Sequence, residues 1–530
     1  MTLADRIQRA MIRTSPYPPV RWIYAAAYGA ILLWLMMRAR AIPEIRRLQW
    51  RAPHRGHRFG VSDLDVRAET TRLGTTQFFA LCDRLADVLR PSSRAMKVLD
   101  FYLFGPDEAQ LQQRLGPISF GDSRLIRLLG PKTQPASEVQ QLSRVPENAM
   151  LCRAMYEYSS LLQEAFAEDP SLHFTWKIFR RFKRIDQGFA SRGGALDSES
   201  APIRERMRER ADRIVAGGAI RELEPSELEE LLAVMLGELD AIPRPSRCHG
   251  KPTQDSIFRS AGKLLAPETL SNAIDSCSPQ VNELCAELAG TVQSAILGCV
   301  PAANFDYRLY LIVRDDLTMH DRIEVFRAIR AMYSPGSRVR HIPSTYLRLR
   351  YPIVLTPAMW RASARWYHAV RPVEECFFIQ RHGVVLCGLD VRGEVVPPAD
   401  IDVIRSAAIA AADLRNLIWS AVRDGRSRRL VDLLLGRVPA LWLLLTQSII
   451  ASSCAEAIAE CAAADLPNVS VLEELHEKLG AMIPEQLPGL GERVWKPALD
   501  ASSRWIDAIV QLAVARLDAC ASDDTSVAQG

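Results

Sequence analysis

The sequence has no closely paired cysteines and none of the short motifs that mark the commonest nucleotide-binding and hydrolytic sites. Its eleven cysteines are scattered, and none forms a Cys-x-x-Cys pair. This pattern argues against a structural zinc site, including one at Cys248-His249, and predicts reduced thiols in a cytoplasmic protein. The absence of GxxxxGKS or GxxxxGKT, GxGxxG, HExxH and GxSxG argues against P-loop, dinucleotide-binding, zinc-protease and serine-hydrolase sites.

A strong excess of charge of either sign is also missing, because the net charge at pH 7 is only +4 over 530 residues. So small an excess argues against a dedicated nucleic-acid binder. The composition, 48% hydrophobic and 24% charged, is that of a globular protein rather than a disordered chain. The length exceeds what one hydrophobic core serves and predicts roughly two to four domains.

One long apolar segment is present near the N-terminus, at residues 22–37, with the sequence WIYAAAYGAILLWLMM between Arg21 and Arg38. It is shorter than the roughly 20 residues that span a bilayer, and no small-residue cleavage site marks it as a signal peptide. We expect a buried helix that packs on the next domain in a cytoplasmic protein. A helix that associates with the membrane is the alternative.

Residues 45–105 alternate between strand and helix patterns. The stretch 45–50 alternates apolar and polar residues, and the segment SDLDVRAE at 62–69 does the same. Residues 75–90 have helical apolar spacing, a threonine start and Pro91 as the expected end. The apolar stretch 96–105 stops at Gly105-Pro106. The predicted order is therefore strand, strand, helix, strand.

The rest of the chain reads as helical regions around a second mixed region. Residues 305–316 predict a strand, 319–333 a helix, and 376–390 two strands around a His382-Gly383 turn. No tandem repeat is evident. The predicted class is α+β: a small mixed sheet with large helical regions. The expected parts are an N-terminal helix at 1–44, a core at 45–106, a mainly helical region at 107–300, a second mixed region at 301–395, a helical region at 396–521 and a flexible tail at 522–530.

Three aspartates in this core have the pattern of a divalent-metal site. Asp63 and Asp65 are separated by one residue on a predicted strand, so their carboxylates share one face and repel each other unless a cation lies between them. Asp100 interrupts an apolar strand, where a charged residue needs a specific role. If the two strands are adjacent, Asp100 lies beside the pair. Carboxylates, water and phosphate oxygens are the ligands that Mg²⁺ prefers.

The segment GVSDLDV, a helix and then VLDFYLF together resemble the nucleotidyltransferase superfamily, which includes DNA polymerase beta, the aminoglycoside nucleotidyltransferases and the minimal bacterial nucleotidyltransferases. The resemblance implies that Asp63, Asp65 and Asp100 hold Mg²⁺ or Mn²⁺ and that a nucleoside triphosphate is a substrate. It implies further that the triphosphate binds near Gly60 and Ser62, which precede the aspartates, and near the loop. The loop residues concerned are Arg51 and Arg55.

The family places a Gly-Ser pair after its first strand, and Arg51-Ala52 stand there instead. Two hypotheses follow. The chain is a metal-dependent nucleotidyltransferase acting on a hydroxyl acceptor, with a small molecule or a protein favoured over nucleic acid. Alternatively, it is a catalytically degenerate relative that binds a ligand or assembles with a partner. A membrane-attached helical scaffold built on residues 22–37 is a weaker third hypothesis.

Overall fold

A computed structural model gives an α+β architecture in which the chain divides into two compact units. Unit 1 comprises residues 1–146 and 404–530, and unit 2 comprises residues 147–403. The structure describes the following residues: 3–53, 59, 64–95, 99–115, 123–130, 158, 161–162, 165, 172–191, 198–216, 218–241, 259–260, 278–279, 281–300, 306–332, 350–361, 379–380, 383–395, 400–423, 430, 433–451, 454–464, 468–480 and 492–527.

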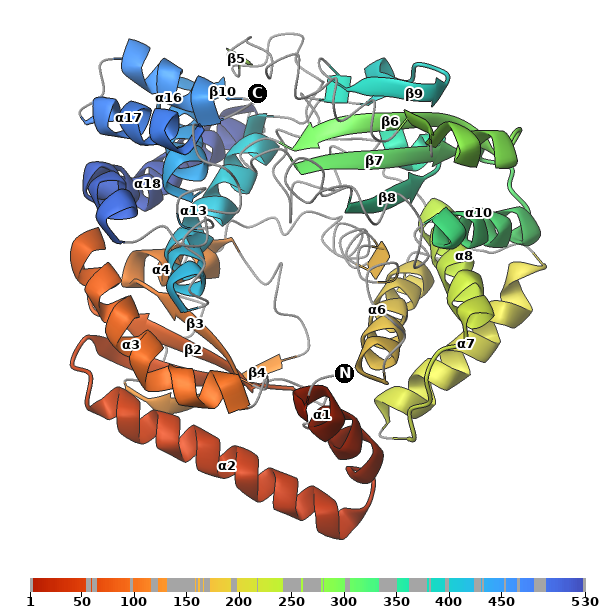
Figure 1. Ribbon diagram of the computed structural model, residues 1–530, viewed down its shortest axis with the longest axis horizontal. Helices are drawn as coiled ribbons and strands as arrows, with labels where there is room; N and C mark the ends of the chain where they lie inside the picture. The colour runs from red at the N-terminus through yellow and green to blue at the C-terminus, as the bar shows by residue number, and fades with distance from the viewer. Residues whose placement is uncertain are drawn as a thin grey trace. The chain divides into compact units, whose positions relative to one another are not determined.

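Unit 1 contains a four-stranded sheet in the order β3-β2-β1-β4, here called the first sheet (Figure 1). Strands β1 and β2 form an antiparallel hairpin, β3 runs parallel to β2, and β4 runs antiparallel to β1. The parallel pair requires a crossover connection, which α3 provides. The strands and the connecting helices are β1 (Ile45–Pro53), β2 (Leu64–Thr70), α3 (Thr75–Ala95), β3 (Leu99–Phe104), α4 (Pro106–Arg114) and β4 (Ser123–Leu129).

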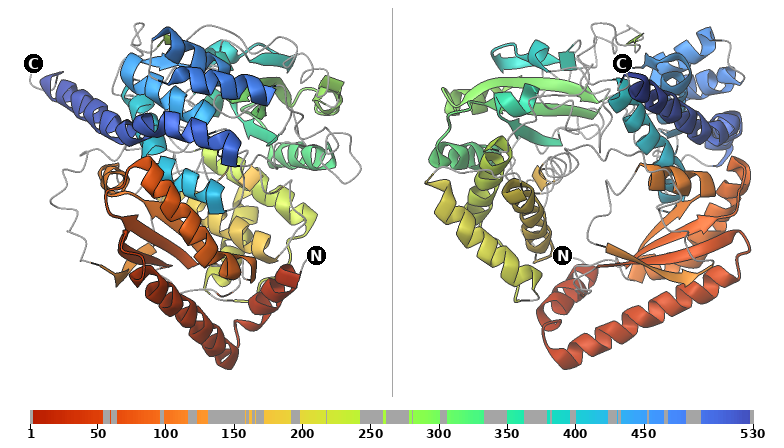
Figure 2. Two further views of the ribbon diagram at one scale, coloured as in Figure 1. Left: turned by 60° about the vertical axis from the view of Figure 1, so that its left-hand side comes forward. Right: turned by 180° about the vertical axis from the view of Figure 1, so that it is seen from behind.

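The apolar face of the first sheet follows the predicted alternation. On β2, Leu64, Val66 and Ala68 are fully buried, whereas the residues between them are only partly buried. Helix α2 (Pro18–Arg40) packs on this face, because Tyr28 forms a buried cluster with Phe59 and Leu64. Helix α2 runs beneath the sheet in both views of Figure 2 and follows the short helix α1 (Leu3–Thr14).

The predicted helix at residues 22–37 is present, but it is mostly exposed rather than buried. Only Tyr28, Leu35 and Ala39 of α2 are buried, whereas Trp22 is 77% exposed. Among the described helices, α2 alone is long and apolar enough to cross a membrane, a test that signal sequences and core helices of soluble proteins also pass.

The C-terminal helices of unit 1 cover β3, the edge strand of the first sheet. Trp419 on α13 (Asp400–Arg423) donates an indole hydrogen bond of 2.6 Å to the carbonyl of Phe101. The amide of Leu103 donates to Asn416 Oδ1 at 3.3 Å. These bonds give hydrogen-bond partners to backbone groups that are otherwise unpaired on an edge strand. The other C-terminal elements are η3 (Leu433–Arg437), α15 (Val438–Gln447), β10 (Ile449–Ile450), α16 (Cys454–Ala463), α17 (Val469–Gly480) and α18 (Glu492–Val527).

Unit 2 contains helices followed by the second sheet, whose order is β8-β7-β6-β9. Helix α6 (Leu172–Ser191) buries phenylalanines on one face, as its amphipathic pattern predicts. The remaining elements are α7 (Ser200–Val215), α8 (Pro225–Ala241), β5 (Arg259–Ser260), β6 (Val292–Val300), β7 (Asp306–Val313), α10 (Met319–Met332), β8 (Arg350–Leu355), β9 (Val384–Gly388) and η2 (Arg392–Glu394).

The two sheets have the same topology, although the sequence shows no evident tandem repeat. Each begins with an antiparallel hairpin, continues through a helix to a parallel strand, and ends with an antiparallel strand on the opposite side. The register irregularities of the two hairpins also coincide. One lies between Ile45 and Arg47 on β1, and its counterpart lies between Val292 and Ser294 on β6.

A glycine with positive φ lies at the same point of both sheets. Gly130 follows β4 with a φ of +89°, and Gly388 ends β9 with a φ of +81°. A Cβ on Gly130 would lie 2.3 Å from the carbonyl oxygen of Arg46, and one on Gly388 would lie 2.2 Å from that of Gln293. Both positions therefore require glycine for conformation and for space.

In each unit a side chain from outside the sheet donates a hydrogen bond to the parallel edge strand. In unit 2, Tyr158 donates a hydrogen bond to the carbonyl of Val354 on β8, the counterpart of β3, and α8 contacts α10 through Glu229 and Arg330. In unit 1, α13 covers β3 and α18 contacts α3 through Asp507 and Thr75. The helices of unit 2 precede their sheet in the sequence, whereas the C-terminal helices of unit 1 follow theirs by about 300 residues.

Several predicted boundaries differ from the structure. The region at 107–300, expected to be mainly helical, contains β4 and β6. Helix α3 continues past Pro91 to Ala95, since proline removes one helical hydrogen bond but keeps a helical φ. Ile379 and Gln380, expected in a strand, are helical. Helix α18 runs past Ser522 to Val527. Cys248-His249 and His382 lie outside the described residues.

Candidate functional site

Three of the predicted site residues form a row across the first sheet. Arg51 on β1 lies opposite Asp65 on β2, and Asp65 lies opposite Asp100 on β3. Register partners on neighbouring strands point to the same face of a sheet, and their strands lie about 4.8 Å apart. The predicted adjacency of the strands that carry Asp65 and Asp100 is therefore confirmed.

Asp65 and Asp100 are on the polar face of the first sheet and are partly accessible. The side chain of Asp65 is 29% exposed, and its Oδ2 lies 3.7 Å from Nη1 of Arg51, whose side chain is 18% exposed. Asp100 is also partly buried. The row holds two neighbouring carboxylates beside one guanidinium. Carboxylates this close repel each other, which favours binding of a cation between them.

Farther along β1 and β2, the charges on this face are paired within the sheet. Arg47 donates to Glu69 at 2.9 Å. The guanidinium of Arg67 lies over the ring of Phe104, 4.7 Å from its centre. Burial lowers the pKa of Arg67, and Glu69 opposes this effect. These side chains therefore have partners within the sheet, whereas Asp65 and Asp100 lie at the other end of the polar face.

The loop before β2 contains the other predicted residues. Asp63, Arg55, Gly60 and Ser62 all lie outside the described residues. Within the described part of the chain, no group of three or more acidic, cysteine or histidine side chains is arranged to hold a metal ion. The proposed third carboxylate belongs to Asp63 and is therefore not included in that finding.

Arg51-Ala52, which replace the expected Gly-Ser pair, lie inside β1. Arg51 pairs with Asp65 on one side and with Leu125 of β4 on the other. The backbone there is part of a three-strand ladder. The long side chain of Arg51, rather than a bare backbone, thus stands beside Asp65.

No protein-family model matches the sequence, and a comparison with curated proteins finds no match.

In the second sheet, the same register positions carry different residues. The position of Arg51 is taken by Gly298, and that of Asp65 by Arg308, whose partner on β8 is Arg350. The two sheets thus share a topology but not an acidic row. No local motif in the sequence marks this correspondence, because it depends on strand pairing.

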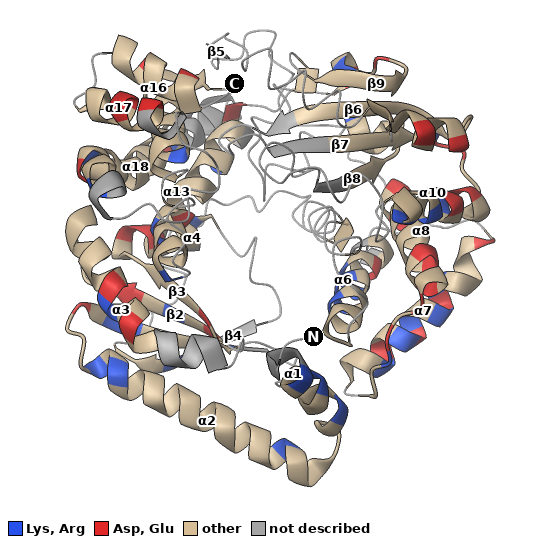
Figure 3. Cartoon of the chain, in the orientation of Figure 1, with Lys and Arg blue, Asp and Glu red and all other residues tan. Residues whose placement is uncertain are grey.

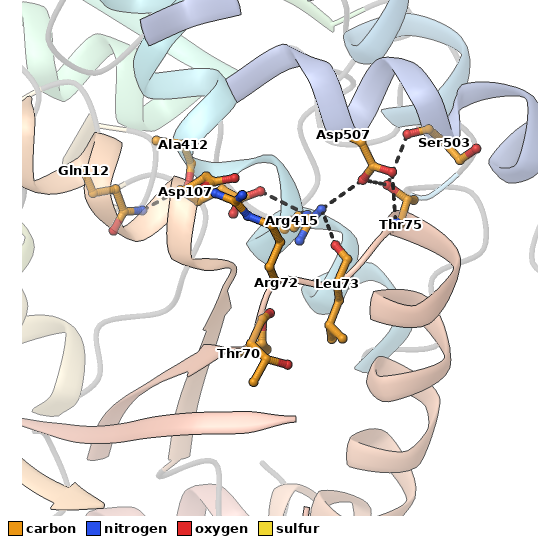
Figure 4. A network of polar contacts seen from close by, with 12 residues as sticks. Thr70, Arg72, Leu73, Thr75, Asp107, Gln112, Ala412, Arg415, Ser503 and Asp507 are labelled. Atoms are coloured by element: carbon orange, nitrogen blue, oxygen red, sulfur yellow. Dashed lines mark hydrogen bonds and ion pairs between the residues drawn. The ribbon is translucent and has the colours of Figure 1, made fainter. Parts of the chain in front are cut away.

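A second charged cluster lies at the opposite end of β2 and β3 (Figure 4). Arg415, only 8% exposed, donates to the carbonyl of Leu73 at 2.9 Å and to Asp507 at 3.0 Å, and its Nε lies 3.0 Å from Glu108. Asp507 also accepts a hydrogen bond of 2.7 Å from Thr75 at the start of α3. Burial raises the pKa of Glu108, and Arg415 opposes this.

This Arg415 cluster joins α13 and α18 to the first sheet. The acidic residues of this cluster already have a basic or hydroxyl partner. The cluster therefore has the character of a structural contact between helices and sheet rather than of a ligand site. No local pattern in the sequence predicts it, because Leu73 and Arg415 are 342 residues apart. The Arg51–Asp65–Asp100 row is the stronger candidate for chemistry.

Proposed function

We propose that the protein is a metal-dependent nucleotidyltransferase that moves a nucleotide from a nucleoside triphosphate to a hydroxyl acceptor. The observation that carries the proposal is the direct pairing of Asp65 with Asp100 on adjacent parallel strands. A nucleotidyltransferase-like core is supported by the hairpin, helix and parallel strand that hold these two acids. The further sequence support is Asp63, two residues before Asp65.

The residues fit a divalent cation by donor type. Asp65 and Asp100 offer carboxylate oxygens from one face, and Asp63 adds a third carboxylate if the strand pattern extends to it. Mg²⁺ or Mn²⁺ bound there would neutralise triphosphate charge. In the reaction, the acceptor oxygen bonds to the α-phosphorus, the hydroxyl proton is released and pyrophosphate leaves.

Arg51 has two roles open to it. Its planar guanidinium can bind phosphate oxygens beside Asp65. Alternatively, it can form an ion pair with the Asp65 carboxylate in place of a metal ion. The modest net charge favours a small-molecule or protein hydroxyl over a nucleic-acid end as acceptor.

Thermal stabilisation by nucleoside triphosphates tests the proposal. The full chain is heated with ATP, GTP, CTP or UTP, in the presence of Mg²⁺ or Mn²⁺ or of a chelator. We expect stabilisation by at least one triphosphate that requires the metal and is lost in Asp65→Asn and Asp100→Asn. Asp107→Asn is the matched control, since this carboxylate pairs with Arg72 away from the row. Stabilisation retained by both row variants would refute the proposal.

A catalytically degenerate ligand-binding protein is the second candidate. The Arg51–Asp65 ion pair and the absence of Gly-Ser favour it, because an arginine can neutralise the acid without metal. This candidate predicts triphosphate binding in chelator that Asp100→Asn leaves unchanged. Incubation with labelled triphosphates and a metabolite mixture then separates the two, because only the enzyme transfers label.

A further inference from the structure

The N-terminal helices present an apolar surface that nothing in the described structure covers. Of the eight large hydrophobic side chains that are most exposed in the described residues, six belong to α1, α2 or the turn between them. These are Ile7, Tyr17, Trp22, Ile23, Leu33 and Met37. On α2, Trp22, Leu33 and Met37 repeat at helical spacing, with Ala26 and Gly29 between them. They form a continuous stripe, here called the outer stripe.

The opposite face of α2 is fixed to the first sheet. The ring of Tyr28 meets that of Phe59 edge-on at 4.9 Å, and Tyr24, Ile31 and Leu32 pack on the same cluster. The hydroxyl groups of Tyr24 and Thr14 share a hydrogen bond of 2.7 Å, which ties α1 to α2. Helix α2 therefore cannot be surrounded by lipid without losing these contacts.

The charge around the outer stripe is almost entirely positive. Helix α2 has no acidic residue, and α1 has one, Asp5. Figure 3 shows basic residues on α1 and near both ends of α2. The exposed arginines are Arg6, Arg13, Arg21, Arg38 and Arg40. Arginines at both ends of an apolar stripe that includes a tryptophan can bind the phosphates of an anionic membrane while the stripe contacts its acyl chains.

We propose that α1 and α2 attach the protein to an anionic lipid surface, with α2 lying along the membrane. Trp22, Leu33 and Met37 enter the acyl boundary, and the arginines contact lipid phosphates. A second copy of this chain is disfavoured as the occupant, because a symmetric contact would bring the same arginines together. A membrane-spanning arrangement is disfavoured because the inner face of α2 is packed on Phe59 and Leu64.

Vesicle sedimentation of the full chain tests this inference without reference to any activity. Vesicles of phosphatidylcholine alone are compared with vesicles that contain roughly 30% phosphatidylglycerol, at low and high salt. We expect binding to the anionic vesicles that weakens as salt increases. The double variant Trp22→Ser/Leu33→Ser should bind about tenfold more weakly. Leu389→Ser, at an exposed leucine of unit 2, is the matched control and should bind as the unchanged protein does.

Four outcomes overturn the inference. The protein stays in the supernatant with anionic vesicles, or it binds neutral vesicles equally well at all salt concentrations. A concentration-dependent dimer that the double variant abolishes, without vesicle binding, assigns the stripe to a second copy instead. Resistance to extraction by high salt and alkaline carbonate assigns α2 to a membrane span. Circular dichroism and thermal unfolding of the double variant establish that it is folded, so that lost binding is interpretable.

Discussion

Arg51 is the residue on which the two functional candidates differ most. Its guanidinium competes with any cation for Asp65, at a distance of 3.7 Å. We predict that Arg51→Gln raises the affinity of the full chain for Mn²⁺ in the absence of nucleotide, by roughly threefold to tenfold, because it removes a positive charge beside the carboxylate. Titration monitored by Mn²⁺ electron resonance measures this. An unchanged affinity would indicate that Asp65 is not a metal ligand.

The same substitution should have little effect on folding. The ion pair is partly exposed and long, so its loss should change the free energy of unfolding by less than about 1 kcal/mol. A larger loss of stability would assign Arg51 a structural role in the sheet.

Glu238 gives a second prediction at the residue scale. It is buried in unit 2 and accepts a hydrogen bond of 2.7 Å from Arg204, and burial together with the nearby Asp186 raises its pKa from 4.5 to about 8. The folded protein therefore holds a proton that the unfolded chain releases between these values, and stability falls as pH rises through this window. Glu238→Gln stays neutral and should unfold with a flatter pH dependence.

The difference between variant and unchanged protein should grow from pH 5 to pH 9 and reach on the order of 1–3 kcal/mol in favour of Glu238→Gln. Thermal unfolding across this pH range measures it. Glu227→Gln is the control. Hydrogen bonds from Arg221 and Arg210 lower the pKa of Glu227 to about 2, so its contribution to stability is fully present above pH 5 and this variant should be destabilised by the same amount from pH 5 to pH 9. A constant offset between Glu238→Gln and the unchanged protein would contradict the prediction.

At the scale of the elements, Gly130 and Gly388 test whether both sheets require glycine at the same position. Gly130→Ala and Gly388→Ala should each destabilise their unit by about 2–4 kcal/mol, because a Cβ would clash with a backbone carbonyl at a positive φ. Gly290→Ala is the matched control. Gly290 has a φ of +86° and open space around its Cβ position, so only the conformational cost of about 1 kcal/mol remains.

Chemical denaturation of the three glycine variants measures these costs. If Gly130→Ala and Gly290→Ala lower the free energy of unfolding equally, the short distance from Gly130 to the carbonyl of Arg46 does not require glycine there.

The sequence predicted those elements whose patterns are local. The alternation at Leu64 and Val66 identified β2, and the apolar spacing after Thr75 identified α3. Strand β6 was missed because its segment VQSAILGCV is nearly continuous apolar sequence, and periodicity alone does not distinguish a buried strand from a helix. The adjacency of Asp65 and Asp100 was predictable because the helix between their strands implies a parallel pair.

Strand pairing and distant contacts could not be predicted in this way. Trp419 and Phe101 are 318 residues apart, and no motif connects them. The shared topology of the two sheets was also hidden, since Arg51 and Asp65 in one correspond to Gly298 and Arg308 in the other. These features depend on tertiary structure, whereas Asp65 was visible as part of an Asp-x-Asp pair and Asp100 as a charge in an apolar strand.

At the scale of the whole molecule, the order of the parts predicts an unequal dependence on the C-terminus. The first sheet is covered by helices after residue 404, whereas unit 2 is continuous from 147 to 403. A chain that ends at residue 403 should lose amide protection in β1, β2 and β3 and keep it in β6, β7 and β8. Hydrogen exchange with mass spectrometry measures this. Equal protection of both sheets would show that the helices of unit 1 are dispensable.

The distance in sequence between β3 and the helix that covers it also affects how the protein is made. The backbone of Leu103 meets Asn416, 313 residues later. At roughly 5–20 residues per second, a ribosome needs about 15–60 s to supply that stretch. Throughout this delay the outer edge of β3 is uncovered, although β2 pairs with its other edge, and binding by chaperones is the simplest protection against aggregation at that edge.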